Sequence, residues 1–130
     1  MRTPVAIAAL CTAVALTGCD SATKQNERAR ARAVVEKFAL ASGTKACDYL
    51  GGGALEDNYG GRDYATGKAR CRAASKKFTG EAITVKDVKL TSDTTARVDA
   101  ITKAGVLYVV SLSKPQGDWV IERIIPQRQQ

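Results

Sequence analysis

Hydrophobic side chains follow three different patterns along the chain. A mostly apolar run covers residues 5–16. Between residues 26 and 80, apolar side chains recur three or four residues apart, which indicates amphipathic helices. From residue 83 they alternate with polar side chains, as in strands that bury one face. The pattern therefore predicts helices first and strands afterwards.

Three helical segments are expected before Gly80. The first spans residues 26–43, with Asn26 as its cap, Gly43 as its end and an apolar stripe along one side. A short second helix at 45–50 is stopped by three consecutive glycines. The third helix covers residues 66–78 and is closed by Gly80. Residues 54–62 show no sustained period and are predicted to form a mobile loop.

Four strands are expected, at residues 83–90, 95–101, 106–112 and 119–125. Short loops rich in turn residues join them, which specifies an antiparallel meander. In the first strand the apolar parity switches between Val85 and Val88, which is typical of a bulge, and bulges bend strands. The third strand is apolar on both faces and is expected to be central. The predicted class is α+β, with N-terminal helices packed on a curved four-stranded antiparallel meander.

The first twenty residues describe an export signal. Met1-Arg2 provides a positive start, and the apolar run that follows is too short to remain in a bilayer as a spanning helix. We expect residues 1–18 to be removed as a signal peptide.

The residues at the end of this signal, Leu16-Thr17-Gly18-Cys19, resemble the lipobox of bacterial lipoproteins. The resemblance implies that Cys19 receives a diacylglyceryl group, becomes the new N-terminus and anchors the protein to the outer face of the bacterial cytoplasmic membrane. Residues 19–26 are then a short polar tether, residues 27–126 one domain and residues 127–130 a polar tail. The alternative is an ordinary secretory leader that contains a cysteine near its end.

The remaining cysteines, Cys47 and Cys71, are expected to form a disulfide in an oxidising compartment. A metal pair or a redox thiol is the alternative. The chain contains no histidine and no Cys-x-x-Cys spacing, so neither a metal nor a cofactor is expected.

Charge bears on partners rather than on fold. The chain has 20 Lys and Arg against 13 Asp and Glu, a formal net charge of +7, which favours an anionic lipid or wall polymer as a partner. Lys68, Arg72 and Lys76 recur at four-residue spacing and are candidate contacts, although a solvated helix face has the same pattern. No nucleic acid is expected, because the chain carries a signal for export and no nucleic-acid module.

The element order, the two paired cysteines and the closing strand Gly117-Asp118-Trp119-Val120-Ile121 resemble the nuclear transport factor 2-like superfamily over about residues 28–125. The resemblance implies a cone, in which a bent sheet wraps around helices and leaves a pocket at the open end. Members include ketosteroid isomerases, dehydratases and polyketide cyclases as well as non-enzymatic lipoproteins, so membership does not decide function. Sheet faces in this superfamily often dimerise, and a homodimer or another protein partner is therefore among the expectations.

An isomerase of this fold uses a carboxylate base and acidic hydrogen-bond donors inside an apolar cavity. The candidate bases are Asp48, Asp87 and Asp99. The candidate donors are Tyr49, Tyr59, Tyr64 and Tyr108. Spacing singles out none of them: Asp99 is expected in water, on the face opposite Val98, and Tyr108 in the core or a pocket wall.

The leading expectation is a non-catalytic, lipid-anchored envelope domain that binds a small amphiphile or a protein partner. The candidate ligand contacts are the rings of Tyr49, Tyr59, Tyr64 and Trp119, with core packing as the alternative for Trp119. An isomerase-, cyclase- or dehydratase-like enzyme is the second expectation and requires a carboxyl group buried in a pocket. A basic adaptor for anionic polymers is the third.

Overall fold

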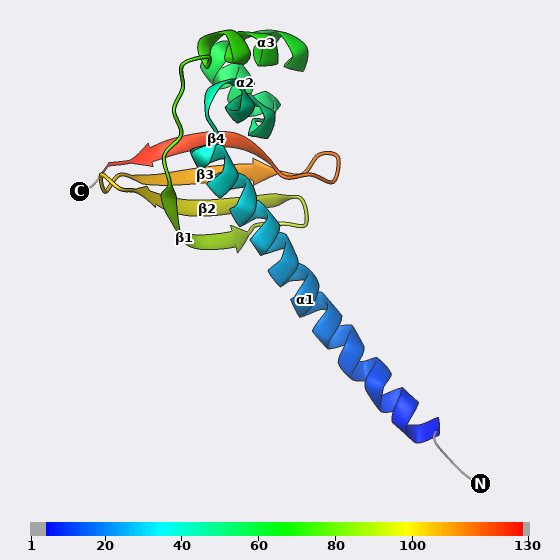
Figure 1. Cartoon of the computed structure of the whole chain (residues 1–130). Coiled ribbons are helices and arrows are strands. Elements are labelled where there is room, and N and C mark those ends of the chain that lie inside the picture. Colours follow the sequence, from blue (N-terminus) through cyan, green and yellow to red (C-terminus); the bar gives the residue numbers. More distant parts are fainter. Residues whose placement is uncertain (1–4, 129–130) are drawn as a thin grey trace.

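The computed structural model describes the backbone of residues 5–128 and the side chains of residues 22–128. Over this range, four helices precede a four-stranded sheet (Figure 1). The helices are α1 (Val5–Leu40), the 3-10 helix η1 (Gly43–Tyr49), α2 (Gly52–Tyr59) and α3 (Tyr64–Ala74). The strands are β1 (Ile83–Leu90), β2 (Thr95–Thr102), β3 (Leu107–Ser113) and β4 (Val120–Gln127). The predicted α+β class is confirmed.

The sheet is an open antiparallel meander in the order β1-β2-β3-β4. Each strand boundary lies within two residues of its predicted position, and β3 is central, as predicted. The predicted bulge is also confirmed, because the pairing of β1 with β2 shifts between Val85 and Asp87.

The two faces of the sheet have different roles. One face is covered by α1, which lies across it (Figure 1), and Val98 is fully buried there. Asp99 points to the opposite face, as predicted, and forms an ion pair of 3.0 Å with Arg97. We call the face covered by α1 the inner face and the face that carries Asp99 the outer face.

Helix α1 differs from the expectation at its N-terminal end. The predicted start at Asn26 is wrong, because the helix runs without a break from Val5 and includes residues 19–26. The reason is local: no glycine or proline occurs between Asp20 and Leu40, and Ala, Arg, Glu and Lys prevail there. The side chain of Cys19 and the structure of residues 1–4 lie outside the described residues. Within residues 5–128 no helix is both long and apolar enough to span a bilayer.

Helix α2 occupies much of the segment that was expected to be a mobile loop, so that prediction is also wrong. Its weak local pattern is compensated by distant partners. Ala54 and Leu55 are buried, and Glu122 of β4 accepts a hydrogen bond of 2.8 Å from the Gly53 N–H and one of 2.7 Å from Ser113 Oγ. This carboxylate therefore caps a helix that has no side-chain cap of its own at Gly51.

Helix α3 begins and ends earlier than predicted. Asp63 caps its start by accepting a hydrogen bond of 2.8 Å from the Thr66 N–H, and the helix ends at Ala74. Gly80 does not close it. A Cβ at Gly80 would lie only 2.5 Å from the Leu40 carbonyl, so this glycine lets the connection to β1 pass against the end of α1. Because α3 ends at Ala74, Phe78 lies outside the helix, and it is 46% exposed.

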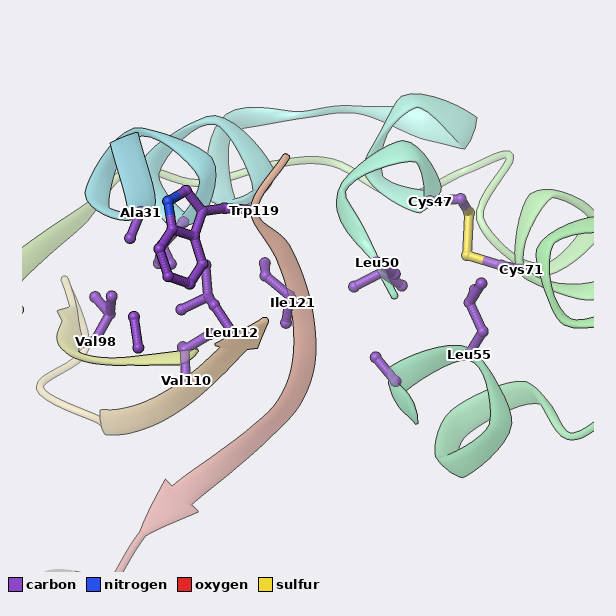
Figure 2. Close-up of a cluster of buried hydrophobic side chains, with 13 residues drawn as sticks. Ala31, Cys47, Leu50, Leu55, Cys71, Val98, Val110, Leu112, Trp119 and Ile121 are labelled. Carbon is purple, nitrogen blue, oxygen red and sulfur yellow. A yellow bond between two sulfur atoms is a disulfide. The ribbon is translucent and has the colours of Figure 1, made fainter. Parts of the chain in front are cut away.

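A single core joins the sheet to the small helices. Figure 2 shows Ile121 between Leu112 on the sheet side and Leu50 on the helix side. The predicted disulfide Cys47–Cys71 is confirmed (Cα–Cα 6.0 Å). In the chain-entropy model, closing this loop stabilises the folded state by about 3.5 kcal/mol, because it restricts the unfolded chain. Among the described side chains, residues 22–128, those of this core lie between residues 31 and 124.

Candidate functional site

An apolar cavity of about 360 Å³ lies between the C-terminal half of α1 and the inner face of the sheet. Helix α1 contributes Val35 and Phe38, and the strands contribute Ile83, Tyr108 and Ile124. The chain leading from α3 to β1 adds Phe78. Because Phe78 remains 46% exposed, the cavity is open to solvent beside this ring.

The cavity exists because α1 does not cover the whole inner face. Small side chains, Ala39 on the helix and Ala100 on β2, leave space between the two layers. The early end of α3 then brings Phe78 across the opening instead of placing it on a helix. Leu40, at the end of α1, is 60% exposed and adds to the apolar surface of this end of the molecule.

The polar groups of the cavity lie among Thr79, Glu81, Thr102 and Tyr108. Glu81 is the carboxylate among the lining residues, and it is exposed. A carboxyl group acts as a base with a raised pKa when it is buried in apolar surroundings. Glu81 does not have these surroundings.

The three candidate bases lie elsewhere. Asp48 is about half exposed and pairs with Lys68 and Arg72, each at 3.4 Å. Asp99 lies on the outer face, and Asp87 lines a different groove, between α1 and β1. The structure therefore brings none of the candidate bases into the apolar cavity.

The four candidate rings are not brought together either. Trp119 is buried in the core, which is the alternative interpretation of this residue. Tyr49 and Tyr59 are half-buried against the core, and Tyr64 is 50% exposed in a groove that it shares with Gly52 and Glu122. The aromatic ring that β3 contributes to the cavity is that of Tyr108. This agrees with the prediction that Tyr108 lies in the core or a pocket wall.

The predicted cationic face of α3 is partly neutralised. Lys68 and Arg72 share the carboxylate of Asp48, and Lys68 Nζ also lies 5.5 Å from the centre of the Tyr64 ring. Lys76 is exposed and, within residues 22–128, has no ion-pair partner. Of the three candidates, it alone presents an uncompensated charge in this part of the chain.

The outer face of the sheet carries a second apolar surface. Ile101 pairs with Leu107, and Val109 pairs with Ile125, on the strands β2, β3 and β4. Three of these side chains are half-buried and Ile125 is 40% exposed. Unlike the cavity, this surface is not enclosed by a helix.

Within the described residues no three His, Cys, Asp or Glu side chains are grouped so that they could hold a metal ion. Comparison of the chain with protein-family models, curated proteins and solved structures finds no match.

Proposed function

We propose that this chain is a non-catalytic binding domain of the bacterial cell envelope, anchored by lipid on Cys19, that holds a small amphiphile between α1 and the sheet. The observation that carries the proposal is the cavity wall of Phe38, Phe78 and Tyr108 with aliphatic neighbours. Aromatic and aliphatic walls with a few polar groups are typical of sites for small apolar ligands. The polar groups near Thr102 and Glu81 would face the head of such a ligand.

The non-catalytic part of the proposal is supported by the placement of the carboxylates. An isomerase or cyclase with this arrangement of helices and strands would need a desolvated acid beside the ligand. The lining carboxylate, Glu81, is exposed, and the candidate bases Asp48, Asp87 and Asp99 lie outside the cavity. Membership of the nuclear transport factor 2-like superfamily is part of the same proposal and agrees with helices followed by an open meander.

The test is binding of 1-anilinonaphthalene-8-sulfonate, followed by its fluorescence, and displacement of this probe by fatty acids. Phe78→Ser removes an exposed ring from the cavity and is expected to weaken probe binding about tenfold. Ile125→Ser is the matched control, because Ile125 has a similar exposure, 40% against 46%, but lies on the outer face. Loss of binding in the Ile125 variant with retention in the Phe78 variant would place the ligand on the outer face and overturn the proposal.

A further inference from the structure

A second groove, of about 470 Å³, separates residues 25–32 of α1 from the edge strand β1. Val85 and Val88 line it from the strand, and Ala29 lines it from the helix. Three cations surround this apolar floor, Arg28 and Arg32 from α1 and Lys86 from β1. Asp87 is the single carboxylate among the lining residues.

The bulge in β1 explains the position of Lys86. Val85 pairs with Ala100 and Asp87 pairs with Asp99, so Lys86 is the extra residue between them. An extra residue in one strand bends that strand and redirects its side chain. Lys86 consequently lines the groove in front of α1.

The charges of this groove are available to a ligand. Arg32 is paired with Glu36 of the next helical turn at 2.6 Å. Within residues 22–128, Arg28 and Lys86 have no ion pair or side-chain hydrogen bond, and both are exposed. This distinguishes them from Lys68 and Arg72, which share Asp48.

The same side of α1 carries positive charge toward the proposed anchor. Lys24, Arg28 and Arg32 are spaced four residues apart and therefore lie along one side of the helix. Arg28 follows Cys19 by nine residues in one continuous helix, which corresponds to about 14 Å along its axis. Lys24 is closer still, at about 8 Å, which is comparable to the Debye length at physiological ionic strength.

We propose that the groove between α1 and β1 binds the phosphate of an anionic phospholipid at the membrane surface, with Arg28 and Lys86 as the phosphate contacts and Val85 and Val88 beneath the glycerol. This site is separate from the apolar cavity, and it uses the proposed lipid anchor only to explain why the groove is close to the membrane. Helix α1 would tilt until its cationic side meets the headgroups. The domain would then hold a fixed orientation at the surface, with the edge of β1 toward the bilayer.

The test uses a chain that begins at residue 20, which lacks the leader and the lipid but keeps every side chain that the structure describes, residues 22–128. Sedimentation with vesicles of phosphatidylcholine containing 30 mol% phosphatidylglycerol is compared with vesicles of phosphatidylcholine alone. We expect binding to the anionic vesicles only, abolished by high salt, because the attraction is electrostatic. The double variant Arg28→Gln/Lys86→Gln is expected to bind about tenfold more weakly.

The matched control is Lys77→Gln/Lys103→Gln, which removes the same charge from two exposed lysines, one after α3 and one in the turn between β2 and β3. An equal loss in both double variants would show that net charge alone drives binding and would overturn the assignment to the groove. Equal binding to neutral vesicles would also overturn it. Titration with inorganic phosphate forms the third arm: phosphate binding that depends on Arg28, without vesicle binding, would assign the groove to a free anion instead. The probe binding that depends on Phe78 is measured separately, so failure of either proposal leaves the other intact.

Discussion

Glu27 of α1 accepts a hydrogen bond of 2.8 Å from the indole Nε1–H of Trp119, 92 residues later in the chain. The same carboxylate oxygen accepts a hydrogen bond of 2.9 Å from Lys114, whose ammonium lies 5.3 Å from the centre of the indole ring. Arg30 binds the other oxygen of Glu27 at 2.9 Å and the Gly117 carbonyl at 3.1 Å. These contacts fix α1 to the hairpin between β3 and β4, so the helix that leads to Cys19 has a defined direction relative to the sheet.

Replacing Glu27 by alanine is expected to lower the free energy of unfolding by about 2 kcal/mol, because the buried indole N–H of Trp119 and the half-buried Lys114 both lose their acceptor. Urea denaturation followed by Trp119 fluorescence measures the change. Glu36→Ala is the control, since it breaks an exposed helical pair with Arg32 and should cost less than about 0.5 kcal/mol. If both variants lost the same amount, the contact with Trp119 would contribute nothing beyond a surface ion pair.

Glu27 also predicts how stability depends on pH. The hydrogen bond from Lys114, followed by that from Trp119 and the nearby charge of Arg30, holds the pKa of Glu27 below its ordinary value of 4.5 although burial opposes this. Since the folded pKa is lowered, the contribution is complete above the unfolded value and is lost as the pH falls through the folded value. The unfolding free energy should therefore drop between pH 5 and acidic pH more steeply in the wild type than in Glu27→Gln.

Asp63 also contributes to the pH dependence, and it is unchanged in both the wild type and Glu27→Gln. Its pKa is lowered by the hydrogen bonds from the Thr66 N–H and hydroxyl, and this contribution has the same sign in both proteins. Urea titrations at a series of pH values give the unfolding free energy of the wild type and of Glu27→Gln, and the difference between the two curves is the contribution of Glu27. Parallel curves would mean that the Glu27 contacts are not linked to folding.

The first two residues of α2, Gly52 and Gly53, give a prediction with an internal control. A Cβ at Gly53 would lie 2.6 Å from the Glu122 carboxylate, whereas a Cβ at Gly52 would meet no atom within 4 Å. Gly53→Ala should cost about 1–3 kcal/mol through this overlap, while Gly52→Ala should be neutral or slightly stabilising. Thermal unfolding of the two variants provides the measurement.

A double-mutant cycle attributes the cost to Glu122. In a Glu122→Ala background, Gly53→Ala should lose most of its effect, because the overlapping carboxylate is gone. An unchanged cost in that background would assign the strain to the backbone of β4 instead. This outcome would show that the Glu122 carboxylate is not what excludes a side chain at Gly53.

The parts of the fold that the sequence predicts well are those with local causes. Alternation and short turns locate the four strands, and the parity switch near Val85 locates the bulge. Helix α2 was not predicted, because the side chain that caps it, Glu122, is 69 residues from Gly53 and local sequence patterns do not include it. The residues that line the cavity have no local signal either, because Phe78 lines it together with distant residues of α1 and the sheet, and Gly80 packs against the end of α1. The partner of the Trp119 indole, Glu27, is 92 residues away in the chain, and no local pattern reveals it.

The lipid anchor is tested by the contrast between two cysteines of the N-terminal segment. A diacylglyceryl group supplies two acyl chains, and each buried methylene contributes about 0.8 kcal/mol, so the modified protein should stay with the membrane fraction. Cys19→Ala should abolish incorporation of radiolabelled palmitate and release the protein from membranes. Cys11→Ala should change neither result, because Cys11 lies within the proposed leader, residues 1–18. Palmitate labelling that survives in Cys19→Ala, or membrane retention without labelling, would leave α1 without a lipid at its start and would remove the positional argument for the groove at Arg28.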